Sequence, residues 1–408
     1  MTYAAFLWGL IWAGMFTGLY NATAILMHKS TLNYIQGARA FLPLAAVYLG
    51  LVWLLAKRPK FQFVGNPIGY LFGYCFIGLA SSLFLSPQPV SSMYWLGLYA
   101  APILVVWYCL DKTESRAYLR LLMRINYIFF FLLVLIIMPE SLRVGWGNLP
   151  PFQQYTLPFG LGTQRTNGAG RFALVVLIVC VVRFLLVKNR WRWIWPVFGL
   201  AAFFLLLQTQ SRTSLLGLAV TALLLILLLG LDWRYAFIGP LMAAGAYFSG
   251  FQMRAHGQMN RLVDLTGRQY TWQKGLDQIL QSPFLGWGFN ADRILLNAEH
   301  MHNSFLHAAI HTGVLGVFFF AATFISLWAL VIRTRLFVRA RHFSGPDKPF
   351  LFESILIAGF LTARGFFEST GAFYGVDLLL LVPAVAFIGI MARRETDQPA
   401  AGEEEKAL

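Results

Sequence analysis

Four of the seven histidines in this 408-residue chain fall within a stretch of twelve residues. His300 and His302 stand two residues apart, directly before Asn303, and His307 and His311 follow at helical spacing. An unperturbed imidazole titrates near a pKa of about 6.5, so a histidine can take a proton from a hydroxyl at neutral pH. We therefore place a general base at His302 beside Asn303. We interpret His300 as solvated and His307 and His311 as packing residues.

A metal site is the alternative chemistry for this stretch, because His-X-His pairs occur in metal centres. Here the only carboxylate nearby in the sequence is Glu299, and no cysteine falls on this side of the predicted topology. We therefore expect no metal ion. A metallohydrolase built on His300 and His302 stays open as a weaker hypothesis.

A second group of candidate residues consists of arginines. An arginine fork donates two hydrogen bonds to a phosphate and does not lose its charge. Arg212 lies between two apolar stretches, where a charge costs roughly 2.5–3.5 kcal/mol and marks a candidate functional site. Ser211 and Thr213 flank it, which favours a polar pocket over an arginine that reaches to the membrane surface. The others lie in two long loops: Arg165, Arg171, Arg261 and Arg268. These residues predict an anionic ligand.

Composition indicates which elements must position these side chains. Hydrophobic residues make up 58% of the chain and charged residues only 12%, whereas soluble domains are about 25% charged. The apolar residues come in continuous blocks, which favours helices over a membrane barrel. We predict an all-α, polytopic integral membrane protein with about 12 transmembrane helices, or 11 if 350–366 does not cross. The expected spans are 4–27, 40–56, 68–86, 91–110, 123–139, 172–187, 193–209, 213–231, 235–251, 313–332, 350–366 and 374–392.

Charge sets the expected orientation. The net charge is +15, and most Lys and Arg fall in loops that would be cytoplasmic if both termini lie inside. No basic run interleaved with aromatic residues suggests a nucleic-acid partner. We predict one transmembrane domain over residues 1–392, with long loops on the outer, non-cytoplasmic side at 140–171 and 252–312. Residues 393–408 form a polar tail that we expect to be disordered and cytoplasmic.

Short helices are expected in the second long loop. Residues 267–280 predict a helix with Tyr270, Leu276, Ile279 and Leu280 on one face over the membrane. Residues 302–311 predict another helix before the span at 313. Arg364, Glu368 and Asp377 are expected to form an ion-pair network near the last spans, with Glu368 in a structural role.

Four stretches, in order, resemble the O-antigen ligase and polymerase family of bacterial envelope glycosyltransferases. They are Ser211-Arg-Thr-Ser-Leu-Leu-Gly-Leu218, Gly267-Arg-Gln-Tyr-Thr-Trp272, Ser282-Pro-Phe-Leu-Gly-Trp-Gly-Phe289 and His302-Asn-Ser-Phe-Leu306 with Gly313-Val-Leu-Gly316. The resemblance covers about residues 200–335. Upstream spans are similar in hydropathy alone.

The resemblance implies a GT-C-like bundle in the bacterial inner membrane, with periplasmic helices over a lipid-open cavity. It implies a metal-independent, inverting transfer without a cofactor, from a glycan on undecaprenyl pyrophosphate. Arg212 and Arg268 would then hold the pyrophosphate, and His302 would act on the acceptor hydroxyl, although His300 could take that part. The further candidates for substrate contacts are Arg165, Arg171, Arg261, Asn303 and His300.

The acceptor stays open at this point. Transfer to lipid A core, as by an O-antigen ligase, is slightly favoured over a polymerase that extends another lipid-linked glycan, and transfer to a protein is a third option. A transporter or flippase for a lipid-linked sugar is the alternative of another class. It would use the same arginines for binding without making a bond.

Overall fold

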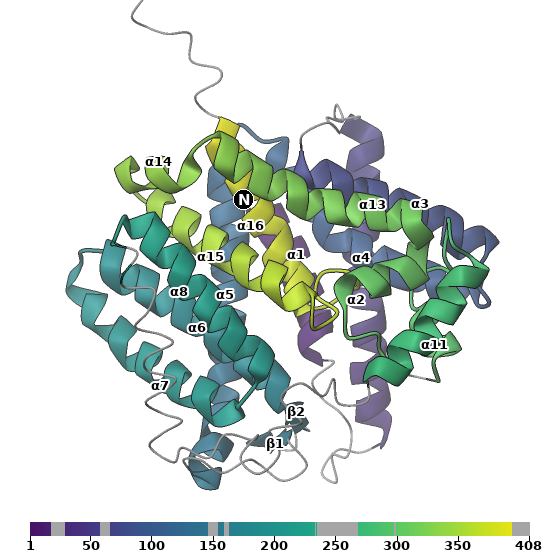
Figure 1. Ribbon diagram of the computed structural model, residues 1–408, viewed down its shortest axis with the longest axis horizontal. Coiled ribbons are helices and arrows are strands. Elements are labelled where there is room, and N and C mark those ends of the chain that lie inside the picture. The colour runs from purple at the N-terminus through teal and green to yellow at the C-terminus, as the bar shows by residue number, and fades with distance from the viewer. Residues whose placement is uncertain are drawn as a thin grey trace, which may run out of the picture.

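A computed structural model describes residues 1–17, 29–57, 66–145, 154–158, 163–232, 234, 268–297 and 299–393. In this part the chain is almost wholly helical, as predicted for an all-α membrane protein (Figure 1). The helices are α1 (Thr2–Thr17), α2 (Lys29–Lys57), α3 (Pro67–Phe84), α4 (Pro89–Leu110), α5 (Ser115–Val144), α6 (Thr166–Leu186), η3 (Arg190–Trp193), α7 (Ile194–Thr209), α8 (Arg212–Leu229), α11 (Arg268–Gln281), α12 (Ala291–Leu295), α13 (Ser304–Arg333), α14 (Leu336–His342), α15 (Asp347–Gly365) and α16 (Val376–Arg393). One strand pair, β1 (Gln154–Thr156) with β2 (Thr163–Arg165), was not predicted.

Nine helices of the described residues are long and apolar enough to cross a membrane. They correspond to the expected spans within α2 to α8, α13 and α16, with η3 and α7 counted together. α15 lies where the span 350–366 was expected, but it carries Asp347, Glu353 and Arg364 and is not among these nine helices. Of the first expected span, α1 covers residues 2–17. The expected span 235–251 lies outside the described residues.

Side-chain contacts gather several helix ends at one end of the bundle. Arg364 at the end of α15 donates to Thr213 at the start of α8, over 3.1 Å. Asp377 at the start of α16 accepts from Arg364 (3.4 Å) and from Arg171 near the start of α6 (3.0 Å). These ends are the ones that the predicted topology places on the same side. We call this end of the bundle the site end.

A tight turn between α7 and α8 shapes the site end. Gln210 has a left-handed backbone that ends α7, and Ser211 starts the next helix. Gly170 of α6 lies against this turn, since a Cβ there would stand 2.8 Å from the Thr209 Oγ1 and 2.9 Å from the Ser214 Oγ. Any larger residue at 170 would therefore push α6 away from the turn that places Arg212.

α13 contains a break that separates its histidine-bearing first turns from its apolar length. Gly313 has φ 60° and ψ −166°, a conformation that is essentially restricted to glycine. The loop after α11 fits into the break: Val314 donates to Pro283 O (2.8 Å) and Gly288 donates to His311 O (2.8 Å). The predicted short helix ahead of a span at 313 thus agrees with the structure.

α11 agrees with the predicted short helix, but its predicted apolar face is divided. Tyr270, Leu276 and Leu280 are exposed, whereas Ile279 packs against a small buried cluster that contains Leu296. Ile279 was predicted to share one apolar face over the membrane with these three residues, but it is partly buried and packs inward. The residue instead joins α11 to the segment that precedes α13.

Candidate functional site

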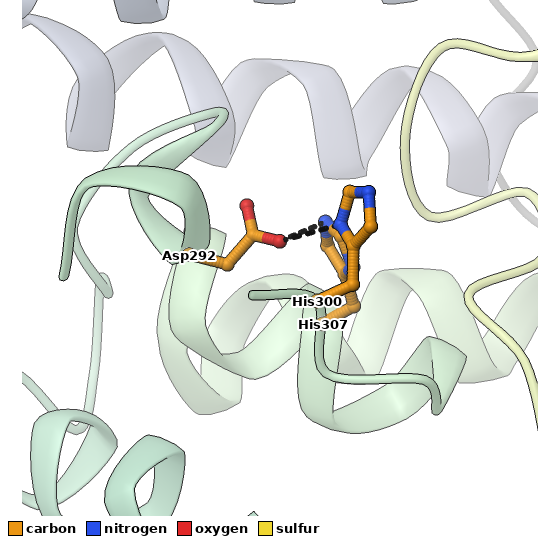
Figure 2. A group of neighbouring side chains, drawn as sticks. All are labelled: Asp292, His300 and His307. Atoms are coloured by element: carbon orange, nitrogen blue, oxygen red, sulfur yellow. Dashed lines mark hydrogen bonds and ion pairs between the residues drawn. The ribbon is translucent and has the colours of Figure 1, made fainter. Parts of the chain in front are cut away.

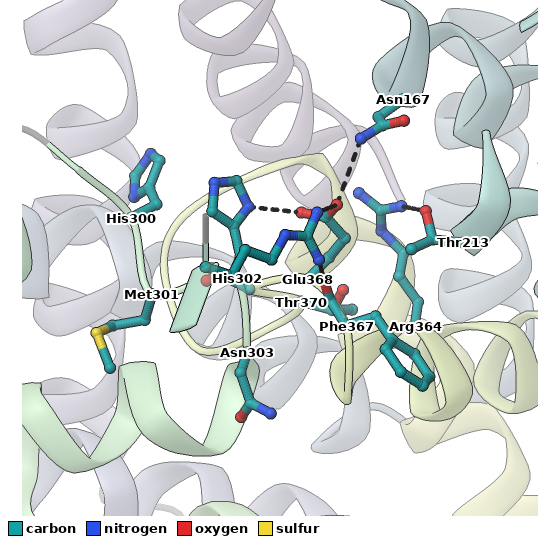
Figure 3. A network of polar contacts seen from close by, with 12 residues as sticks. Asn167, Thr213, His300, Met301, His302, Asn303, Arg364, Phe367, Glu368 and Thr370 are labelled. Atoms are coloured by element: carbon teal, nitrogen blue, oxygen red, sulfur yellow. Dashed lines mark hydrogen bonds and ion pairs between the residues drawn. The ribbon is translucent and has the colours of Figure 1, made fainter. Parts of the chain in front are cut away.

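The Glu368 carboxylate is the centre of the polar cluster at the site end (Figure 3). It follows α15 and accepts hydrogen bonds from His302 Nδ1 (3.0 Å), Arg268 (3.0 Å) and Asn167 Nδ2 (3.4 Å). Arg268 donates a further bond to the carbonyl of Phe367, over 2.5 Å. One buried carboxylate thus brings together three parts of the chain that are far apart in sequence.

The backbone around Glu368 is fixed by α13. The Ser304 hydroxyl donates to the carbonyls of Glu368 (3.0 Å) and Thr370 (2.8 Å) and accepts from the Thr370 N–H over 2.6 Å. Asn303 caps α13 through its Oδ1, which accepts from the N–H groups of Phe305 and Leu306, while its Nδ2 donates to Phe366 O. These contacts join the 366–370 loop to the residue after His302.

Electrostatics keeps Glu368 ionised. Burial raises its pKa, but the hydrogen bond from His302 and the positive charges of Arg364 and Arg268 outweigh burial and lower the pKa to about 2. An ionised carboxylate has no proton to donate, so His302 Nδ1 must donate to it. In the neutral imidazole this bond leaves the lone pair on Nε2, which is the form that a general base needs.

His302 is held in an unusual backbone conformation. Its φ is 48°, in the left-handed region that costs non-glycine residues energy and that is found repeatedly at functional sites. Its side chain is about one third exposed, at 35%. Glu368 thus holds the Nδ1 edge of the imidazole, and part of the side chain remains exposed.

Arg212, the remaining residue of the expected catalytic set, is the first residue of α8 and is exposed. Its neighbour Thr213 binds Arg364, four residues before Glu368. Arg212 therefore starts a helix at the same end of the bundle as Arg268 and His302. The expected ion pair between Arg364 and Asp377 is present, and Glu368 contacts Arg268 and His302. The role of Glu368 stays a prediction.

The other expected substrate contacts have different surroundings. Arg171 is bound to Asp377, and Asn303 is used as a helix cap, so the fold already employs both side chains. Arg165 is exposed at the end of β2. Burial lowers the pKa of Arg293, and the positive charge of Arg165 lowers it further. Arg261 lies outside the described residues. The roles of these residues stay predictions.

A second polar cluster surrounds Asp292, a buried residue that the sequence did not single out (Figure 2). Asp292 lies near His300 Nδ1 (3.1 Å), His311 Nε2 (3.2 Å) and His307 Nε2 (3.6 Å). The inference that Glu299 is the only nearby carboxylate is wrong in space, because Asp292 and Glu368 contact the histidines. Glu299 accepts from Thr271. His300 binds a carboxylate and is only half-buried, and His307 and His311 are buried as expected of packing residues, yet they face the same carboxylate.

Asp292 is ionised in this environment. Burial raises its pKa, but the charges and hydrogen bonds of His307, His300 and His311 together lower it well below its usual range. Ligand atoms of Asp292, His300 and His307 all lie within 4.8 Å of one another, so the set has the residue types of a metal centre. No sequence pattern marks this set, because Asp292 comes from a short helix in a loop.

These features define a polytopic α-helical membrane protein with a Glu–His–Arg cluster at one end of its bundle. Residues 197–321, which contain Arg212, Arg268 and His302, match the family model described as O-Antigen ligase. The chain is also similar to the exopolysaccharide production protein ExoQ of Rhizobium meliloti (strain 1021), with 27% identity over 180 residues, or 37% of this chain and 39% of ExoQ. The match spans about two fifths of that relative's length. The resemblance to the O-antigen ligase and polymerase family is thereby confirmed for this part of the chain.

Proposed function

We propose that this protein transfers a glycan from undecaprenyl pyrophosphate to an acceptor hydroxyl at the periplasmic face of the bacterial inner membrane. The observation that carries the proposal is the shared contact of Arg268 and His302 with Glu368, at the end of the bundle where Arg212 starts α8. A phosphate-binding side chain and a proton acceptor are thus neighbours, as a transfer that expels a pyrophosphate requires.

In the proposed step His302 Nε2 removes the proton from the acceptor hydroxyl, and that oxygen attacks the anomeric carbon of the donor. A new carbon–oxygen bond forms while the bond from the anomeric carbon to the pyrophosphate oxygen breaks. Its electron pair remains on undecaprenyl pyrophosphate. Arg268 and Arg212 stabilise the charge that develops there, which positioned donors do well where water is excluded. Attack from the side opposite the leaving group inverts the anomeric carbon.

Glu368 has a positioning role in this proposal. Its negative charge holds the His302 Nδ1 proton in place and aligns Arg268, while Arg268 has further N–H groups for a phosphate. Glu368 thus orients the proposed base His302, as the third member of a catalytic triad orients its histidine.

The test uses purified protein in lipid nanodiscs with a synthetic undecaprenyl-pyrophosphate-linked glycan and lipopolysaccharide that lacks O antigen. We expect His302→Ala to lower the rate at least about 100-fold while donor binding is retained. Arg268→Ala should weaken both donor binding and rate, and Arg268→Lys should restore part of each, since lysine keeps the charge without the fork.

Matched controls are His342→Ala, at the exposed end of α14, and Lys274→Ala, a partly exposed residue of α11. Both should leave transfer unchanged. A His302→Ala protein that still moves lipid-linked sugar across the membrane at the wild-type rate would favour the carrier hypothesis and contradict the transferase.

A polymerase is the second candidate, since the similar ExoQ is described as an exopolysaccharide production protein. Glycan chain lengths in a deletion strain separate the two. A ligase deletion leaves the lipid A core bare and accumulates long lipid-linked polymer, whereas a polymerase deletion leaves a single repeat on the core.

A further inference from the structure

A cavity of about 410 Å³ lies beside His302 and is not used by the step above. Its polar floor is the Asp292 cluster, and His300 connects the two sites, with its ring centroid 6.1 Å from that of His302. The cavity is lined by Gly14, Met15, Tyr94, Trp95, Leu98, Phe289, Asn290, Asp292, Arg293, His300, His307, His311, Phe373 and Tyr374. The volume is within the usual range of small-ligand pockets.

The walls of the cavity are aromatic. Tyr94 and Trp95 come from α4 and pack edge to face, with ring centroids 5.6 Å apart. Phe373 also lines the cavity, and it stacks on His307 with a centroid distance of 5.2 Å and an angle of 15°. Tyr94, Trp95 and Phe373 are all only partly buried, so they keep ring surface to offer a ligand.

The floor of the cavity combines an ionised carboxylate with nitrogen donors and acceptors. Asp292 is 1% exposed as a residue and accepts from His300 Nδ1. His311 Nε2 lies 3.2 Å from Asp292 and accepts from the backbone N–H of Asn290, and Arg293 also lines the space. Pyranose rings have apolar C–H faces and hydroxyl edges, which match flat aromatic walls and a carboxylate respectively. We propose that this cavity binds the sugar ring of the acceptor, with Asp292 accepting hydrogen bonds from its hydroxyls.

The cavity's position fits the acceptor. In Figure 3, His302 lies between His300 and Glu368. His300 lines the cavity, and Glu368 binds Arg268. Nδ1 is used on Glu368, which leaves Nε2 for the other side of the ring. This inference rests on the proposed function, because it assigns the donor phosphates to Arg268 and the acceptor hydroxyl to His302.

A metal ion is a less suitable occupant. Arg293 contacts His300 Nε2, and a guanidinium only donates, so that nitrogen accepts. Neutral His300 then carries its proton on Nδ1 and donates it to Asp292, whereas a metal ion would need the lone pair of that nitrogen. The positive charge of Arg293 also opposes a divalent cation.

The first measurement is binding without turnover. Saturation-transfer NMR on protein in nanodiscs, free of sugar-based detergent, uses a panel of free hexoses, N-acetylhexosamines and 6-deoxyhexoses. We expect at least one of these sugars to bind the wild-type protein, and Asp292→Asn and Trp95→Ala each to abolish or weaken its signal. Asp277→Asn and Trp191→Ala, both exposed positions away from the cavity, serve as controls.

The second measurement is the kinetic split with the acceptor that the wild-type protein uses. We expect Asp292→Asn to raise the acceptor KM about 10- to 100-fold, as for loss of a hydrogen bond to a charged group, and Trp95→Ala to raise it about 3- to 10-fold. The donor KM and kcat at saturating acceptor should change little. Folding loss would lower kcat and leave both KM values unchanged.

Other results would overturn the inference. If the wild-type protein binds no sugar in the panel, the cavity assignment is wrong. The proposed function still stands in that case if the protein transfers glycan. A donor KM that rises in place of the acceptor KM, or a stoichiometric metal ion that Asp292→Asn loses, also contradicts it. If the protein binds a sugar through Asp292 but has no transfer activity, the cavity is a sugar site and the proposed function is wrong.

Discussion

At the scale of single residues, the candidate site depends on one carboxylate that three donors share. Glu368 orients His302, binds Arg268 and reaches Asn167. The sequence motifs mark His302 and Arg268, but no motif marks Glu368, because a lone acidic residue after an apolar helix has many explanations. The contacts of Glu368 depend on the packing of α15 against α13, which no local sequence pattern specifies.

The depressed pKa of Glu368 makes a prediction about stability and pH. With a folded pKa of about 2 against an ordinary 4.5, the carboxylate stabilises the folded protein above pH 4.5, and this stabilisation is lost as pH falls towards 2. The difference corresponds to about 3 kcal/mol at most. Glu368→Gln should therefore lower the unfolding temperature at pH 7, and its deficit should shrink below pH 4.5.

The measurement is thermal unfolding in nanodiscs at several pH values between 3 and 7. Glu114→Gln, at the start of α5 in an exposed turn, is the control and should show no such pH-dependent deficit. A Glu368→Gln deficit that stays constant down to pH 3 would mean that Glu368 is not the ionised hub described here.

At the scale of elements, apolar length predicted the spans and amphipathic spacing predicted α11, because lipid requires every backbone polar group to be bonded within the helix. The same reasoning could not find Asp292. That residue lies in the five-residue helix α12, and its histidine partners come from α13 and the segment before it. No periodicity marks a contact between a loop helix and the next long helix.

The break in α13 supplies the prediction at this scale. A Cβ at residue 313 would stand 2.3 Å from the backbone carbon of Phe284, and φ of 60° with ψ of −166° already excludes most residues. Gly313→Ala should therefore separate the 283–288 loop from α13 and destabilise the fold by at least about 1–3 kcal/mol. Unfolding temperature and yield of folded protein measure this effect.

Gly389→Ala is the matched control, since nothing lies within 4 Å of a Cβ there and the residue is inside α16. Alanine is a better helix former than glycine, so this variant should be as stable as the wild type or slightly more so. Equal stability of the Gly313→Ala protein would show that the α13 break does not need glycine.

At the scale of the whole molecule, two ends of the bundle carry different chemistry. The site end holds Glu368, Asp292 and the histidines, whereas the other end has basic residues such as Arg116 and Arg120 around Asp347. The positive-inside rule predicted this division from loop charges alone. The rule gives no side-chain contacts, so it indicated which loops share a side but not which residues meet there.

The proposed donor requires the site end to face the periplasm, which labelling in intact cells can test. In a variant with Cys75, Cys109 and Cys180 replaced by alanine, Gln269→Cys on α11 reports the site end, and Asn189→Cys before η3 reports the opposite end; both positions are exposed. A membrane-impermeant maleimide should label Gln269→Cys in intact cells and Asn189→Cys only after the cells are broken. Labelling of Asn189→Cys alone in intact cells would put His302 and Arg268 in the cytosol, where a glycan presented on undecaprenyl pyrophosphate at the periplasmic surface could not reach them.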